Sequence, residues 1–160
     1  MGSMIELTAA DGHKFGAYKA EPAGKPRGAV VVVMEIFGVN SHIRSVADGY
    51  AADGYLAIAP AMFDRVQRNY ECGYTPPEIE VSRGLMQKAS LDDAIKDVTA
   101  AIKAVESAGK VGSSPAQGGK TPPVVGPVAA SGIGIGTART IEIGRRIQHD
   151  QRLAGNLARE

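Results

Sequence analysis

The sequence predicts an α/β fold with a mostly parallel sheet flanked by helices, and three features of the chain support this prediction. An apolar, β-branched run at 29–34 shows no alternation, which is typical of a strand covered on both faces. An amphipathic helical pattern follows this run, and a second short apolar run comes at 55–63. A strand, a helix and a strand in this order predict a parallel βαβ unit with helices over the sheet.

The elements around this unit have local signals of their own. Residues 4–22 alternate apolar and polar positions around an Asp-Gly pair, which predicts two antiparallel strands joined by a tight turn. The helix between the two apolar runs can be capped by Asn40 or Ser41 and can end at Gly54. Its predicted apolar face consists of Ile43, Val46, Ala47, Tyr50 and Ala51.

The rest of the chain divides into a regular part and an irregular part. The clearest helical pattern lies at 90–109, and another helix is predicted to begin near Pro76 or Pro77. The apolar stripe of the clearest helix consists of Leu91, Ile95, Val98, Ile102 and Val105. A further strand is predicted to begin at 110–112, although the Ser-Ser-Pro that follows does not suit a strand. Residues 113–138 are rich in Gly, Pro and Ser, which is typical of loops or linkers. Residues 139–160 are basic and could form a terminal helix, although Gly144 and Gly155 interrupt the pattern.

Composition limits the class of protein. A chain of 160 residues with 44% hydrophobic and 22% charged residues predicts one globular domain at 4–160, with 1–3 interpreted as a cloning scar. The net charge of +1 provides no basic field for nucleic acid. Cys72 is the only cysteine, which favours a reducing compartment. No apolar run approaches the roughly 18 residues of a membrane span, and no signal peptide is visible, so we expect a cytoplasmic protein.

The segment at 30–65 reads VVVVMEIFGVNSHIRSVADGYAADGYLAIAPAMFDR and resembles the dienelactone hydrolase family of α/β-hydrolases. The resemblance extends over about 4–112. It implies an α/β-hydrolase-like fold and hydrolysis of lactones, carboxylic esters or other activated esters, without a cofactor or metal. The implied partner is a small-molecule ester or lactone substrate, with no nucleic acid and no membrane. The family uses a Cys-His-Asp triad whose Cys lies in a G-x-C-x-G elbow.

The resemblance also implies roles for individual residues. Glu35 matches the family's glutamate that interacts with the nucleophilic thiol and helps to generate the thiolate, and the Ile36 amide would contribute to the oxyanion hole. Phe37 and Arg83 fall in regions expected to contact substrate, where an Arg could anchor a carboxylate bidentately. Structural interpretations stay open: Glu35 could pair with Arg44 or a loop amide, Phe37 could be packing and Arg83 a solvated charge.

The nucleophile and the general base are not assigned. No G-x-C-x-G or G-x-S-x-G occurs in the sequence, and Ala116 falls where the family has its catalytic Cys. Cys72 lies in a polar loop without the surroundings that lower a thiol pKa, and the glycines around Ser131 are wrongly spaced for an elbow. In the tail, Arg145 falls where the family has its catalytic His, with His149 four residues further on.

Two other classes of protein are considered. The first is a catalytically inactive, truncated or rearranged hydrolase fragment that assembles as a homo-oligomer through exposed strand edges. The second is a nucleotide-binding module using the Gly-Ile-Gly-Ile-Gly stretch, whose spacing fits neither common phosphate-loop motif. His42 is expected to make a structural hydrogen bond at a strand–helix corner, and His13 is expected to be solvated.

Overall fold

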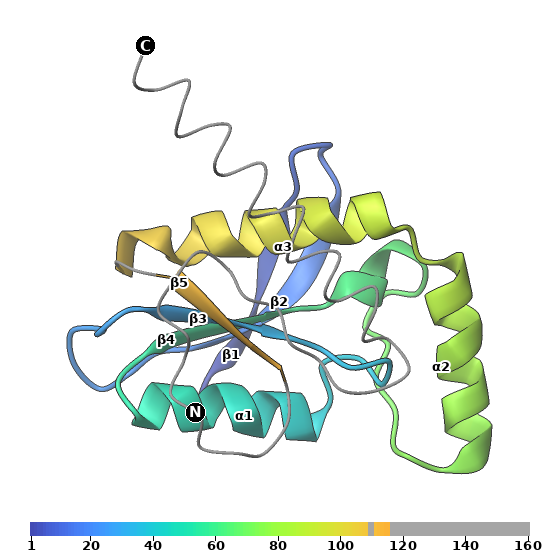
Figure 1. Ribbon diagram of the computed structural model, residues 1–160, viewed down its shortest axis with the longest axis horizontal. Coiled ribbons are helices and arrows are strands. Elements are labelled where there is room, and N and C mark those ends of the chain that lie inside the picture. The colour runs from blue at the N-terminus through green and yellow to red at the C-terminus, as the bar shows by residue number, and fades with distance from the viewer. Residues whose placement is uncertain (109–110, 116–160) are drawn as a thin grey trace.

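The computed structural model describes residues 1–108 and 111–115 of the chain. They form a five-stranded mixed sheet in the order β1-β2-β4-β3-β5, with helices on both faces (Figure 1). The strands are β1 (Ser3–Thr8), β2 (Lys14–Ala20), β3 (Ala29–Val33), β4 (Leu56–Pro60) and β5 (Val111–Pro115). The helices are α1 (Ser41–Ala52), α2 (Pro76–Lys88) and α3 (Leu91–Val105), with short 3₁₀ helices η1 (Met62–Arg65) and η2 (Glu106–Ala108).

The strand pairing confirms the two sequence predictions about topology. β3 runs parallel to β4 and to β5, with Val30 opposite both Ala57 and Gly112. β1 and β2 form the predicted antiparallel hairpin, and β2 also pairs antiparallel with β4. The Ser-Ser-Pro sequence after Gly112 was not expected to be a strand, yet β5 continues through Pro115. Pro115 is the last residue of this strand, at the edge of the described sheet, where a missing N–H is tolerated.

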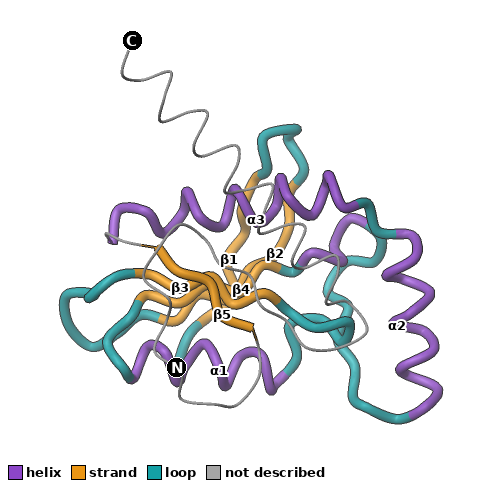
Figure 2. The backbone as a smooth tube through the Cα atoms, in the orientation of Figure 1, coloured by secondary structure: helices purple, strands orange, loops and turns teal. Residues whose placement is uncertain are grey.

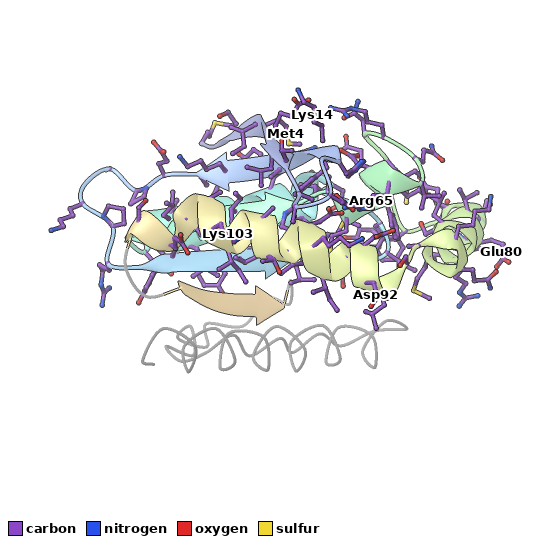
Figure 3. All side chains as sticks on the ribbon, turned by 90° about the horizontal axis from the view of Figure 1, so that it is seen from above. Met4, Lys14, Arg65, Glu80, Asp92 and Lys103 are labelled. Carbon is purple, nitrogen blue, oxygen red and sulfur yellow. The ribbon has the colours of Figure 1, made fainter. Side chains whose placement is uncertain are left out.

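The two faces of the sheet are covered by different helices, as Figure 2 shows. α1 packs on one face through Ile43 and Ala47, and α3 packs on the other through its apolar stripe. Val98, Ile102 and Val105 of that stripe are buried, as is the neighbouring Ala101, while Leu91 and Ile95 are partly buried. Both predicted helix faces are therefore confirmed, and each fully buried Val or Ile contributes about 1.5–3 kcal/mol. α2 lies beyond one end of the sheet in Figures 1 and 3.

Side chains cap the N-termini of α1 and α3, and Asn40 was one of the two residues predicted to cap α1. The Asn40 side chain accepts a hydrogen bond from the Ile43 N–H at the start of α1, and Ser90 accepts one from the Asp93 N–H at the start of α3. Each cap provides an acceptor for one of the N–H groups that a helix start leaves without an intrahelical partner.

Arg65 connects the hairpin to α3. Its guanidinium donates to both carboxylate oxygens of Asp97 at 2.9 and 2.7 Å, and to Asp11 at 3.0 and 3.1 Å. Asp97 is fully buried, and burial raises the pKa of its carboxyl. Hydrogen bonds to Asp97 raise the pKa of Arg65. Removing one partner of such a buried ion pair strongly destabilises the fold, because the other charge is left buried without a partner.

The first residues of the chain and the hairpin turn both make contacts with the rest of the fold, and the expectation for His13 was wrong. Ser3 pairs with Lys19 in the sheet, and the Gly2 N–H donates to Asp48 at 2.8 Å, so residues interpreted as a cloning scar contact the fold. His13, which was expected to be solvated, stacks on Phe15 with its Nε2 atom buried. The hairpin is therefore more tightly packed than its polar sequence indicates.

Across the described residues, no helix is both long and apolar enough to cross a membrane.

Candidate functional site

The candidate site lies in the loop that follows β3. In open α/β sheets, ligands bind beyond the carboxyl ends of the parallel strands, which is where this loop begins. Glu35, Ile36 and Phe37 are half-buried there. The Gly38 N–H donates to the Glu35 carbonyl at 3.3 Å, so the segment forms a tight turn with Ile36 and Phe37 at its centre.

The Glu35 carboxylate has no partner among the residues that the structure describes. Within the described part of the chain it makes no ion pair or hydrogen bond. The structural alternative, a pair with Arg44, is not observed, because Arg44 donates to the Val39 carbonyl at 2.7 Å and pairs with Glu71. A half-buried carboxylate without a protein partner is costly unless a ligand or a reacting group uses it.

The Ile36 amide is also available. Among residues 1–108 and 111–115, no group accepts a hydrogen bond from the Ile36 N–H. It follows Glu35 directly, so a carboxylate and a free amide donor stand side by side at the end of β3. This combination suits a site that binds a developing oxyanion next to a nucleophile.

A second segment holds this loop in place. We call residues 70–74 the clasp, because they lie against the turn after β3. Gly38 forms an isolated antiparallel bridge with Glu71, and the Cys72 N–H donates to the Phe37 carbonyl at 3.1 Å. The Asn40 side-chain NH₂ donates to the Cys72 carbonyl at 3.2 Å. Both backbone polar groups of Cys72, its N–H and its carbonyl, are thus bonded to the β3–α1 loop.

The clasp approaches so closely that it requires glycine at position 38. Gly38 has φ of +78°, which L side chains rarely adopt. A Cβ built there would lie 2.0 Å from the Tyr70 carbonyl oxygen, which is backbone and cannot swing away. Glycine therefore meets both a conformational and a steric requirement at this position.

Phe37 packs against the clasp. Its ring meets the Tyr74 ring edge-on, with centroids 4.6 Å apart and an interplanar angle of 65°. This geometry is favourable for aromatic pairs. Tyr74 is 54% exposed, so the pair lies at the surface beside the Ile36 amide.

The Cys72 side chain lies in a small cluster of hydroxyl groups. Its Sγ lies 3.2 Å from the Tyr70 hydroxyl and 3.3 Å from the Ser82 Oγ, and the two hydroxyls are 2.9 Å apart. The Ser82 hydroxyl donates to the Glu78 carbonyl at 2.9 Å, and the Tyr70 hydroxyl donates to the Cys72 Sγ. This cluster joins the clasp to α2.

Arg83 lies on the exposed side of α2. Its guanidinium is 3.6 Å from the Glu80 carboxylate, and its side chain is 45% exposed. Figure 3 shows Glu80 on the outer side of α2, at one end of the molecule. The neighbouring residue Ser82 is fully buried, so the helix turns Ser82 inward and Arg83 outward.

The remaining candidates do not add to the described site. Ala116, Ser131, Arg145 and His149 lie outside the described residues. His42 is half-buried in the first turn of α1 and makes a polar or electrostatic contact. Within 1–108 and 111–115, no group of three or more His, Cys, Asp or Glu side chains could hold a metal ion.

Sequence reasoning did not find the clasp. Glu71, Tyr70 and Ser82 carry no motif, and Asn40 was identified only as a helix cap. The available signal was Gly38 followed by a capping Asn, which marks a loop with close backbone contacts but does not say which segment contacts it.

The arrangement of strands and helices defines part of an α/β-hydrolase fold. A crystal structure of a provisionally named dienelactone hydrolase from Klebsiella pneumoniae matches with a TM-score of 0.61 and 26% identity, covering 72% of this chain and 49% of that one. A dienelactone hydrolase-like promiscuous phosphotriesterase from metagenomic libraries matches in fold, with a TM-score of 0.51 and 20% identity over 71% of this chain and 48% of that one.

Residues 15–115 match the model of the dienelactone hydrolase family, and the chain belongs to this family. A Synechocystis sp. protein provisionally named a carboxymethylenebutenolidase is 44% identical over 90 residues, which are 56% of this chain and 37% of that protein. The carboxymethylenebutenolidase of Pseudomonas putida is 38% identical over 61 residues, 38% of this chain and 26% of the enzyme. The chain therefore spans well under half the length of these two relatives.

Proposed function

We propose that the protein hydrolyses lactones or carboxylic esters, with Glu35 and Ile36 as parts of its catalytic site. The observation that carries the proposal is the half-buried Glu35 carboxylate, which no described residue pairs, directly beside the unbonded Ile36 N–H. Membership of the dienelactone hydrolase family supports it, since the relatives are named for cleavage of a lactone. The same similarity favours a hydrolase over an inactive fragment that assembles as an oligomer.

Glu35 acts on the protonation state of the nucleophile, and the Ile36 N–H donates to the oxyanion of the tetrahedral intermediate. Attack on the ester carbonyl moves an electron pair onto its oxygen, and a donor aimed at that oxygen contributes about 3 kcal/mol to transition-state binding. Collapse of the intermediate expels the alkoxide, and water then releases the acyl group.

Phe37 and Arg83 are the proposed substrate contacts. Phe37 lies next to the oxyanion donor, with one face of the site formed by its pair with Tyr74. The ion pair of Arg83 with Glu80 is exposed, and such pairs contribute about 0–1 kcal/mol. A substrate carboxylate could therefore replace Glu80 as the partner of Arg83 at little cost.

The test is turnover of dihydrocoumarin and 4-nitrophenyl acetate by the full chain. We expect hydrolysis above the background rate, and a decrease in kcat/KM of about 10–100-fold in Glu35→Gln. Glu21→Gln is the matched control, because Glu21 is an exposed carboxylate paired with Lys19. Absence of turnover by the wild type, or equal rates in the two variants, would overturn the proposal.

A further inference from the structure

The Asn40 side chain connects three parts of the molecule. It is only 6% exposed. Its Oδ1 accepts from the Ile43 N–H at 3.2 Å, and its Nδ2 donates to the Cys72 carbonyl at 3.2 Å and lies 3.5 Å from the Tyr74 hydroxyl. These partners fix the amide orientation, because the Ile43 N–H requires an acceptor and the Cys72 carbonyl requires a donor.

Asparagine is suited to this double task in a way that other capping residues are not. Asp, Ser and Thr can accept from the first turn of a helix, and all are common N-caps. An ionised Asp has no proton to donate, and the hydroxyl of Ser is too short to cap the helix and also reach a second segment. A position that needed only a helix cap would therefore accept these residues equally well.

The bond to Cys72 completes the attachment of the clasp to the turn after β3. The clasp is otherwise held there by the Gly38–Glu71 bridge, the Cys72 N–H bond to Phe37 and the ion pair between Glu71 and Arg44. Arg44 also donates to the Val39 carbonyl. Phe37, Gly38 and Asn40 thus bond to the clasp directly. Val39 is linked to it through Arg44, which donates to the Val39 carbonyl and pairs with Glu71.

We propose that Asn40 is a positioning residue that holds the Ile36 amide in its donating direction by tying the clasp to the β3–α1 loop. This inference rests on the proposed function. Asn40 touches no reacting atom. It acts through the Cys72 peptide, which in turn fixes the Phe37 carbonyl and so the orientation of the peptide planes in the tight turn that contains Ile36.

The experiment separates this role from helix capping. Asn40→Ser and Asn40→Asp keep an acceptor for the Ile43 N–H and lose the donor to Cys72. Ser90→Ala is the control, because it removes the N-cap of α3, away from the clasp. Steady-state hydrolysis and hydrogen exchange by mass spectrometry are measured on each full-length variant, after unfolding curves have shown that the variant is folded.

We expect kcat to fall at least 10-fold in both Asn40 variants with KM changed less than twofold, because an oxyanion donor acts mainly in the transition state. Exchange should become at least 10-fold faster in peptides covering 34–40 and 70–74, while Ser90→Ala leaves kcat and the exchange of both peptides unchanged. Equal exchange of these peptides in the Asn40 variants and in Ser90→Ala would overturn the proposal, as would a loss expressed in KM alone. If the wild type shows no turnover, the proposed function fails, and the exchange data still decide whether Asn40 holds the loop.

Discussion

Gly38→Ala is the substitution whose effect can be worked out most fully from the structure. The new methyl group meets two separate obstacles. The backbone has φ of +78°, and the Cβ would lie 2.0 Å from the Tyr70 carbonyl oxygen. Gly12→Ala is a matched control, because Gly12 has φ of +84° with nothing within 4 Å of a built Cβ. Both substitutions place an alanine at a positive φ, but only Gly38→Ala also forces its methyl group against a neighbouring backbone atom.

The left-handed conformation costs an alanine about 1–2 kcal/mol. At position 38 the clasp must also move away, because the obstructing atom is backbone. That movement breaks the Cys72 N–H bond to Phe37 and the Asn40 bond to the Cys72 carbonyl, each contributing about 1 kcal/mol. We therefore expect the free energy of unfolding to fall by about 3–4 kcal/mol in Gly38→Ala and by about 1–2 kcal/mol in Gly12→Ala.

Urea unfolding followed by far-UV circular dichroism measures both values, and an unchanged m-value shows that the midpoints are comparable. Equal losses in the two variants, within about 0.5 kcal/mol, would refute the reasoning, since the close approach of the clasp would then cost nothing.

Three further predictions concern charged side chains. Asp97→Ala should lower the free energy of unfolding by about 3 kcal/mol in urea titrations, because it leaves Arg65 partly buried without its main partner. The Asp11 pKa is lowered mainly by hydrogen bonds from Arg65, so this carboxylate stabilises the fold above the ordinary carboxyl pKa of about 4 and less as the pH falls below it. The stability difference between wild type and Asp11→Asn should accordingly narrow between about pH 5 and pH 2. Arg83→Gln should raise KM about 10-fold for a lactone that carries a carboxylate and leave KM for an uncharged lactone unchanged, as steady-state kinetics would show.

The core of the fold could be predicted from the sequence because its signals are periodic or local. The apolar run of β3, the stripes of α1 and α3 and the Asn40 and Ser90 caps are all read from neighbours within a few positions. The resemblance placed Glu35 and Ile36 at the end of a strand, and the structure has them there. The parallel pairing of β3 and β4 followed from the strand, helix and strand order of a βαβ unit, whereas the position of the hairpin beside β4 was not predicted.

What could not be predicted depends on contacts between segments far apart in the chain. Glu71 meets Gly38 through one isolated bridge, for which no sequence pattern exists. Cys72 looked like an isolated thiol in a polar loop, but Tyr70 and Ser82 surround it because α2 folds back over the clasp. The expectation for His13 was wrong because ring stacking on Phe15 gives a polar turn an apolar neighbour.

The isolated bridge between Gly38 and Glu71 means that the shape of the β3–α1 loop and the stability of the core rest on different contacts. The sheet and its two helix layers are held by ladders and apolar side chains, whereas the shape of the β3–α1 loop depends on a few bonds to one short segment. Such a contact can open and close without unfolding the domain. Sequence changes in the clasp can therefore alter the geometry of the site while the strand pairing and the apolar contacts of the two helix layers stay in place.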